Sequence, residues 1–515
     1  MNIFSLRTYI FHRHYPPLFW QKITVFVITF ISFALYHASR KNLSGVKVSI
    51  ANDWINGTTY YGQNTTTPLF EKVTEAKKFL GFLDALFMAF YAGALFFWGY
   101  IGDRLNPKNV VTFGMVTSGI SLGLFSLVPY YFNFYNIPWY LVMWAFFGVA
   151  QACGWPNNVA IMGNWFGKGN SNSKNSGTGF ILGLWSANQS VGNIFGSLVV
   201  SIIIKYGYMK TFIVNVLLLF FGAILVKYSI HPSPKDYQNL SDVGEVDSSE
   251  FTTENDNQLD STQTVSMVNS NVTVRVRSSS NSSRNSQINS YAPESEIKEH
   301  ISLSKAILLP GVVPYCLCNA CLKLVNYAFF FWLPFYLSGN YHWSEAAANR
   351  LSIWYDIGGI FGSVLGGIIS DKIGYRTPVI MGMLMISILC LLIYSNLGAS
   401  QFLNMIVMFF LGASIAGPYN LIVGTISVDL GTQKALRGNK EAMSTVSGLI
   451  DGTGSAGSAF GQILIPFVQD NFGWSRVFYM FIITNILAIV CLLQRFIQDI
   501  REIMTSRNTS TARIS

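Results

Sequence analysis

Twelve apolar runs, in two sets of six, restrict this chain to a bundle of helices that cross a membrane. A transmembrane helix needs about 17–25 mainly apolar residues, because each backbone polar group must find its hydrogen bond inside the segment. Only 11% of the 515 residues are charged, against about 25% in a soluble domain. The predicted spans are residues 23–40, 79–100, 110–130, 138–160, 178–204, 208–230, 311–337, 348–370, 377–396, 401–427, 443–468 and 474–494.

A long polar segment separates the two sets of spans. Residues 231–305 are rich in Ser, Asn and acidic residues and poor in aromatic residues, which predicts a disordered cytoplasmic linker. The other predicted parts are a cytoplasmic N-terminus, two six-helix bundles and a cytoplasmic tail, at residues 1–22, 23–230, 306–494 and 495–515.

Basic residues in the short loops predict the orientation. Lysines and arginines gather before the first span, after the fourth and tenth spans and at the end of the chain, which places both termini in the cytoplasm. The loop 52–77 then lies on the opposite, luminal side. It contains two glycosylation sequons, which begin at Asn56 and Asn64.

An internal repeat defines the fold. The string Gly99-Tyr-Ile-Gly-Asp103-Arg104 after the second span recurs as Gly367-Ile-Ile-Ser-Asp371-Lys372 after the eighth, 268 residues later. Three further pairs of motifs recur at offsets of 262, 265 and 266 residues. Two six-span halves related by a parallel repeat describe the major facilitator fold, an all-α membrane architecture of 12 helices in two pseudo-symmetric bundles.

The repeated loop motif predicts a gate. Its glycines allow helix ends to approach closely, and its aspartate suits the positive N-terminal end of a neighbouring helix. We therefore expect a latch between the halves that closes in one state and opens in the other. The predicted gating residues are Gly99, Asp103, Arg104, Gly367, Asp371 and Lys372.

Few charges fall inside the spans, and these mark a candidate site. A charged side chain at the bilayer centre costs roughly 2.5–3.5 kcal/mol, so such residues usually face a cavity. The basic ones are Arg40, Lys41 and Lys47 with the first span and Lys323 in the seventh, and the acidic ones are Asp84, Asp356 and Asp451.

Each of the two main cations has an alternative interpretation. Arg40 follows 17 uncharged residues, so it either snorkels to the membrane interface or, if the helix continues, binds an anion deeper in the bundle. Lys323 is either an anion ligand or the structural partner of Asp84 or Asp356. We favour the ligand role for both cations, because the arginine fork and the lysine ammonium suit phosphate.

Neutral polar side chains in the same spans complete the predicted substrate site. For each aromatic residue among them, packing is the alternative to binding. They are Tyr36, Tyr91, Trp185, Asn188, Gln189, Asn326, Tyr327 and Tyr355.

Other classes of function lack their signals. Cys316, Cys318 and Cys321 are spaced so that a helix spreads them around its axis, so we expect no metal site and no cofactor. We expect neither an enzyme nor a nucleic-acid-binding protein, because no nucleophile–base pair and no basic nucleic-acid patch occurs.

Several strings resemble a known family. Tyr36-x3-Arg40-Lys41, Gly154-Trp-Pro156 and Trp185-x6-Gly192-Asn193 resemble the organophosphate:phosphate antiporters. The strings around Lys323, Asp356 and Asp451 are similar to solute carrier family 37, the sugar phosphate exchangers. Two positions depart from the family pattern: the fifth span has no histidine near Trp185, and Leu95 replaces a lysine of bacterial relatives.

The resemblance implies a secondary transporter of phosphorylated organic anions that works by alternating access. It also implies exchange for inorganic phosphate, but the two departures support the anion class better than strict coupling to phosphate. The resemblance further implies a monomeric transport unit in membrane lipid, with room for an accessory subunit. We expect an endoplasmic reticulum or lysosomal membrane, and Tyr237-Gln-Asn-Leu240 fits a lysosomal sorting signal. Two alternatives stay open: a symporter whose Asp84, Asp356 or Asp451 takes up protons, and a non-transporting receptor or subunit.

Overall fold

The structure is a computed structural model that describes residues 17–56, 68–166, 178–234, 236–237, 301–433 and 442–511. Nearly all of the predicted linker lies outside these residues, as do Asn64 and most of the N-terminus. The Asn56 side chain is also outside the description. Within the described ranges the secondary structure is entirely helical.

Among the described residues, the N-terminal half of the chain contains ten helical elements. They are α2 (Pro17–Gly45), α3 (Lys47–Asn56), α4 (Val73–Gly102), α5 (Pro107–Phe132), α6 (Ile137–Gln151), α7 (Gly154–Phe166), α8 (Thr178–Ser186), α9 (Asn188–Ile203), η2 (Ile204–Tyr206) and α10 (Tyr208–Ser229).

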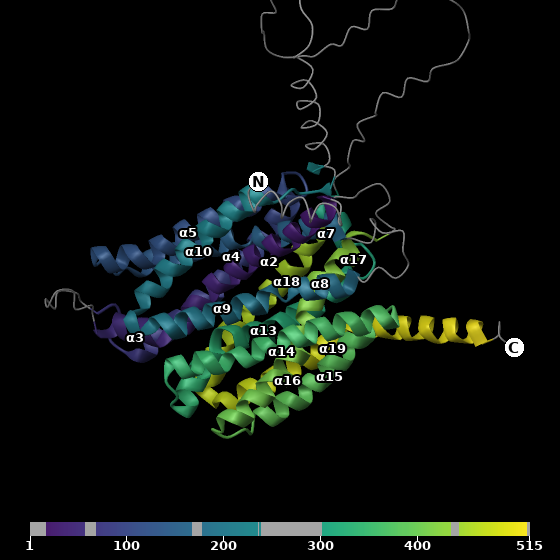
Figure 1. Cartoon of the computed structure of the whole chain (residues 1–515). Coiled ribbons are helices and arrows are strands. Elements are labelled where there is room, and N and C mark those ends of the chain that lie inside the picture. Colours follow the sequence, from purple (N-terminus) through teal and green to yellow (C-terminus); the bar gives the residue numbers. More distant parts are fainter. Residues whose placement is uncertain are drawn as a thin grey trace, which may run out of the picture. The chain divides into compact units, whose positions relative to one another are not determined.

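The C-terminal half contains nine. They are α12 (Leu303–Ile307), α13 (Val312–Tyr341), α14 (Glu345–Ile373), α15 (Thr377–Tyr394), α16 (Gln401–Leu421), η3 (Ile422–Ile426), α17 (Ser427–Gly431), α18 (Met443–Phe472) and α19 (Trp474–Thr511). In Figure 1 the helices from purple to teal are those of the first half, and those from green to yellow are those of the second.

Eleven helical stretches of the described chain are long and apolar enough to cross a membrane. Helix α18 is also 30 residues long, but Ser, Thr, Gly and Asp451 line its buried face, which lowers its hydropathy. Because α18 packs against α4 and α13, protein rather than lipid surrounds that face. The chain is a multi-pass membrane protein.

Polar capping residues lie at the start of two of the spans, and a glycine ends one of them. Asn106 accepts a hydrogen bond from the backbone N–H of Lys108 at the start of α5, and Ser344 accepts one from Ala347 at the start of α14. Gly374 ends α14 with φ of +81°, a conformation that residues with a β-carbon rarely adopt. These turns keep the connections short.

Several predicted boundaries differ from the structure. Helix α2 continues past Arg40 to Gly45, and α3 extends to Asn56, so the predicted loop 52–77 begins inside a helix. Spans four and five are each two helices, broken at Ala152–Cys153 and at Ala187. The tail predicted from residue 495 continues α19 as a helix to Thr511.

Several pairs of helices join the halves, and the most extensive are α4 with α18 and α9 with α14; α8 also packs on α14, and α7 on α18. Glycines bring the first pair close. A β-carbon at Gly99 would lie 2.9 Å from the carbonyl oxygen of Ser444, and one at Gly448 would lie 2.8 Å from that of Leu95. The loop-motif glycine is therefore needed for the close approach of the two bundles.

Candidate functional site

Four buried side chains form a chain of contacts at the centre of the molecule, which we call the central cluster: Arg40, Tyr91, Lys323 and Asp451. An Arg40 Nη2–H donates to Tyr91 Oη at 3.3 Å, and Tyr91 donates to Asp451 at 3.3 Å. Lys323 Nζ donates to the other Asp451 oxygen at 2.6 Å. Helices α2, α4, α13 and α18 thus bring together residues that lie far apart in the sequence.

Arg40 is held inside the protein, with only 1% of its surface exposed. Its Nε–H donates to Gln151 Oε1 at 2.6 Å, and its guanidinium lies 4.5 Å from the centre of the Tyr91 ring. Its Nη1 is buried without a hydrogen-bond partner among the described residues. This position argues against the alternative that Arg40 reaches the membrane interface, and it leaves a donor free for a ligand.

The alternative that Asp84 or Asp356 is the structural partner of Lys323 names the wrong carboxylate. Lys323 pairs with Asp451, and it also donates to Ser455 Oγ at 2.7 Å. Asp84 pairs instead with Lys47, which follows the first span. The sequence places all these residues in the membrane, but which helix each one faces depends on how the helices pack.

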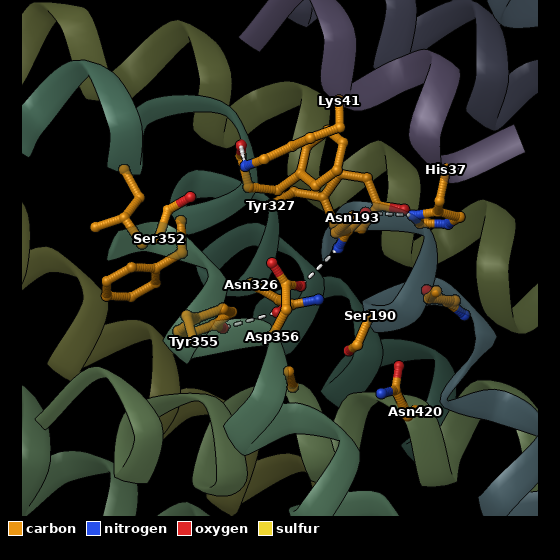
Figure 2. Close-up of a pocket in the computed structure, with 15 residues that line it drawn as sticks. His37, Lys41, Ser190, Asn193, Asn326, Tyr327, Ser352, Tyr355, Asp356 and Asn420 are labelled. Atoms are coloured by element: carbon orange, nitrogen blue, oxygen red, sulfur yellow. Dashed lines mark hydrogen bonds between the residues drawn. The ribbon is translucent and has the colours of Figure 1, made fainter. Parts of the chain in front are cut away.

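A polar cavity lies next to the central cluster, between helices of both halves (Figure 2). Lys41 and Asp356 both face it. Lys41 Nζ donates to the Phe330 carbonyl at 2.7 Å, and Asp356 accepts from Asn193 at 2.8 Å. The lining includes six predicted site residues, namely Lys41, Gln189, Asn326, Tyr327, Tyr355 and Asp356.

Three other predicted ligands, Tyr36, Trp185 and Asn188, are not among the residues that line this cavity. Tyr36 is fully buried and donates to the Val111 carbonyl at 3.0 Å. Trp185 donates to Thr29 at 3.0 Å and stacks on another tryptophan. Asn188 is buried, and neither polar atom of its side chain has a partner within the described part of the chain.

Sequence reasoning missed several residues that face these groups. Gln151 and Ser455 contact the two main cations, and His37, Asn193 and Asn420 line the cavity. Their signal was weak, because each is a polar residue in an apolar run, and only Asn193 and Ser455 belong to motifs. The cavity position of His37, three residues before Arg40, required the structure.

At the end of the bundle that carries the loop motifs, Asp103 contacts the N-terminus of α18. The backbone N–H groups of Ser444 and Thr445 donate to its carboxylate at 3.1 and 2.9 Å, and the Thr445 hydroxyl donates at 2.5 Å. A helix N-terminus favours a negative charge. This contact joins the two halves.

The second copy of the loop motif makes a different contact. Asp371 accepts from Arg376 at 2.6 Å, and Arg376 also donates to Asp429 at 3.2 Å. Burial lowers the pKa of Arg376, but Asp429 and Asp371 outweigh it and raise that pKa. Arg104 lies 3.5 Å from the centre of the Tyr100 ring, and Lys372 is exposed.

At the opposite end, other contacts join the halves. Glu345 of α14 accepts from the backbone N–H of Val48 at 3.2 Å and from the Ser49 hydroxyl at 2.8 Å. Asn349 donates to the Gly45 carbonyl at 3.1 Å, and Ser44 donates to that of Phe330 at 2.9 Å. Contacts between the halves are therefore present at both ends of the bundle.

Comparisons of this chain with known proteins find one family model and a set of similar sequences. The family model described as Major Facilitator Superfamily matches residues 29–439. Sugar phosphate exchanger 3 of Xenopus laevis is 40% identical, over 95% of this chain and 94% of its own length. Sugar phosphate exchanger 3 of Homo sapiens is 38% identical over 99% of each chain. Glucose-6-phosphate exchanger SLC37A2 of Bos taurus is 34% identical over 93% and 94%.

Solved structures share the fold at low identity. The proton:xylose symporter XylE, bound to 6-bromo-6-deoxy-D-glucose, has a TM-score of 0.57 at 13% identity, over 92% of this chain and 95% of that one. A crystal structure of a D-xylose-proton symporter has a TM-score of 0.58 at 12% identity, over 92% and 96%. At this identity the likeness concerns the fold alone.

Proposed function

Because this chain belongs to the major facilitator superfamily and, within it, to the sugar phosphate exchangers of solute carrier family 37, we propose that it exchanges phosphorylated organic anions for inorganic phosphate by alternating access. The observation that carries this proposal is the buried Arg40, whose Nη1 has no partner within the described residues. A phosphate oxygen satisfies that donor with a charge-assisted hydrogen bond.

The charges around the site support an anion as the substrate. Three cations (Arg40, Lys41 and Lys323) face two carboxylates (Asp356 and Asp451), which leaves one net positive charge in the buried centre. An uncompensated buried charge is costly. A bound anion neutralises this positive charge, whereas the protein without substrate must reorient with the charge unneutralised. This difference favours exchange, in which an anion is bound during every reorientation.

The contacts between the halves supply the two gates of the proposed cycle. Opening on one side breaks the contact of Asp103 with the N-terminus of α18, and opening on the other breaks the contacts of Glu345 and Asn349. Asp371 and Arg376 form the corresponding group in the second half. Gly99 permits the tight closure, and we keep Arg104, Gly367 and Lys372 as part of the proposed gate.

The orientation and location are part of the proposal. The basic short loops support cytoplasmic termini, so that Asn56 and Asn64 are luminal and glycosylated. We propose an endoplasmic reticulum or lysosomal membrane, and the sorting signal at Tyr237 supports the lysosomal one. A sugar phosphate and inorganic phosphate are the small-molecule partners, and the transport unit is a monomer that an accessory subunit can join.

Counterflow in proteoliposomes tests the exchange. Purified protein should take up labelled phosphate when phosphate or glucose 6-phosphate is inside the vesicles, and not when they are empty. Arg40→Ala should lose uptake and Arg40→Lys should recover only part of it, because the bidentate fork is lost. Arg350→Ala, which removes an exposed arginine, is the matched control and should transport normally. Normal uptake by Arg40→Ala would contradict the proposal.

A second candidate, proton-coupled symport, rests on Asp356. This carboxylate faces the cavity and forms no ion pair within the described part of the chain, so it can take up a proton. Symport predicts uptake into empty vesicles when a pH gradient is imposed, and loss of that uptake in Asp356→Asn. Uptake that depends only on internal anion excludes it.

A further inference from the structure

His37 lines the polar cavity and carries an unused nitrogen. It lies on α2 with 2% of its surface exposed, and its Nδ1 is 3.0 Å from Asn193 Oδ1. Its Nε2 is buried and has no hydrogen-bond partner among the described residues. Figure 2 shows His37, Asn193 and Asp356 in a row along one side of the cavity.

The row determines which nitrogen of His37 carries the proton. Asp356 as a carboxylate can only accept, so Asn193 must turn its Nδ2–H toward it, as observed at 2.8 Å. The Asn193 oxygen then faces His37 and requires a donor at Nδ1. In the neutral imidazole, Nε2 is therefore a hydrogen-bond acceptor. Lys41 lines the same cavity, and its charge disfavours a second cation there.

An acceptor at this place needs a ligand group that donates a hydrogen bond. Inorganic phosphate carries a proton at neutral pH, but a phosphate bound by Arg40 fills only the central cluster and has no further group for the cavity. A hydroxyl group on the same molecule reaches the cavity, and it both donates and accepts. The cavity offers the complementary groups: Asn420 Nδ2 is a buried donor without a partner in the described chain, and Gln189, Ser190 and Ser352 add neutral polar atoms. Such a mixture of neutral donors and acceptors suits a polyol.

The cavity also adjoins the proposed phosphate site. Tyr327 lines the cavity, and its ring centre is 4.9 Å from Lys323 Nζ. Lys41 directly follows Arg40 in α2. One molecule can therefore place a phosphate at the central cluster and a hydroxylated carbon chain in the cavity.

We infer that the cavity holds the hydroxylated part of a sugar phosphate, and that His37 Nε2 accepts a hydrogen bond from one of its hydroxyl groups. His37 thereby selects phosphorylated polyols over inorganic phosphate. Asn193 and Asp356 are positioning residues that maintain the tautomer. This inference rests on the proposed function, because it assigns one part of the same substrate.

Two substitutions of His37 test the roles of its two ring nitrogens separately. His37→Asn keeps a donor toward Asn193 and removes the unpartnered Nε2, whereas His37→Gln can keep an acceptor near the Nε2 position. Purified full-length protein in proteoliposomes should be assayed with glucose 6-phosphate and with inorganic phosphate. His37→Asn should bind glucose 6-phosphate about tenfold more weakly, the effect of one hydrogen bond, with inorganic phosphate unchanged. His37→Gln should retain most of the preference.

Deoxy sugars give a second measurement that does not depend on a variant. In the wild-type protein, at least one monodeoxy analogue of glucose 6-phosphate should bind about tenfold more weakly than the parent, and His37→Asn should bind the two equally. If every monodeoxy analogue binds like the parent, no hydroxyl is recognised and the inference fails, even where His37→Asn does not fold.

The outcomes also separate the inference from the proposed function. Wild-type protein that exchanges both anions, together with a His37→Asn variant of unchanged preference, overturns only the inference. An equal loss of both anions in His37→Asn assigns His37 to phosphate and overturns it too. Wild-type protein that exchanges neither anion overturns both proposals.

Discussion

Replacing Lys323 with methionine should destabilise the protein, because it strands the carboxylate of Asp451. Both side chains are almost fully buried, and their 2.6 Å contact is the shortest that Asp451 makes. The hydroxyl groups of Tyr91 and Tyr419 stay near the carboxylate, but at 3.3 and 3.5 Å they compensate little. Removing one member of a buried pair costs roughly 3–5 kcal/mol of unfolding free energy.

A double-mutant cycle isolates the pair. Asp451→Asn added to Lys323→Met should restore most of the stability, since replacing both members of a buried ion pair is often neutral. The measurement is unfolding of the purified protein in detergent without phosphate. Lys210→Met removes an exposed lysine and should change the unfolding free energy by less than about 0.5 kcal/mol.

The refuting result is a Lys323→Met variant as stable as the wild type, or one that Asp451→Asn does not rescue. The observed pair would then contribute nothing to folding. If the measurement confirms the pair, Lys323 can still belong to the proposed anion site, because its ammonium group can bind phosphate and Asp451 together. Stabilisation of the wild type by phosphate that is lost in the double variant would support that role.

Three further predictions concern the ends of the bundle. Asp103→Asn should weaken the contact with α18, speed the alkylation of a cysteine introduced at Ser444, and slow exchange, because the helix N-terminus loses its negative partner. Burial raises the pKa of Asp53, so ionising this carboxyl group in the folded protein lowers the stability as pH rises above the usual aspartate pKa. Asp53→Asn should therefore be more stable than the wild type at neutral pH but not below about pH 4. Thermal unfolding at several pH values measures this. Asn56 and Asn64 should carry the only glycans, so a shift on deglycosylation that persists when both are changed to Gln would contradict the proposed topology.

The sequence by itself determined the architecture. Span length and the scarcity of charge predict a helical membrane bundle, because lipid offers the backbone no hydrogen-bond partners. The repeat at offsets near 265 residues predicts two related halves, and the structural comparison bears out the fold. The sequence also identifies Arg40, Lys323 and Asp451 as candidate site residues, because each is a charged residue inside an apolar run.

The tertiary structure decided which of these residues meet. The sequence offers Asp84 and Asp356 as alternative partners for Lys323, but α13 packs against α18, so its partner is Asp451. His37 and Asn193 lie 156 residues apart, and only the packing of α2 against α9 brings them together. Hydropathy and helical period locate a residue along its own helix and around it, but they do not specify which neighbouring helix it faces. The packing of helices across the two halves sets those contacts, and with them the form of the site.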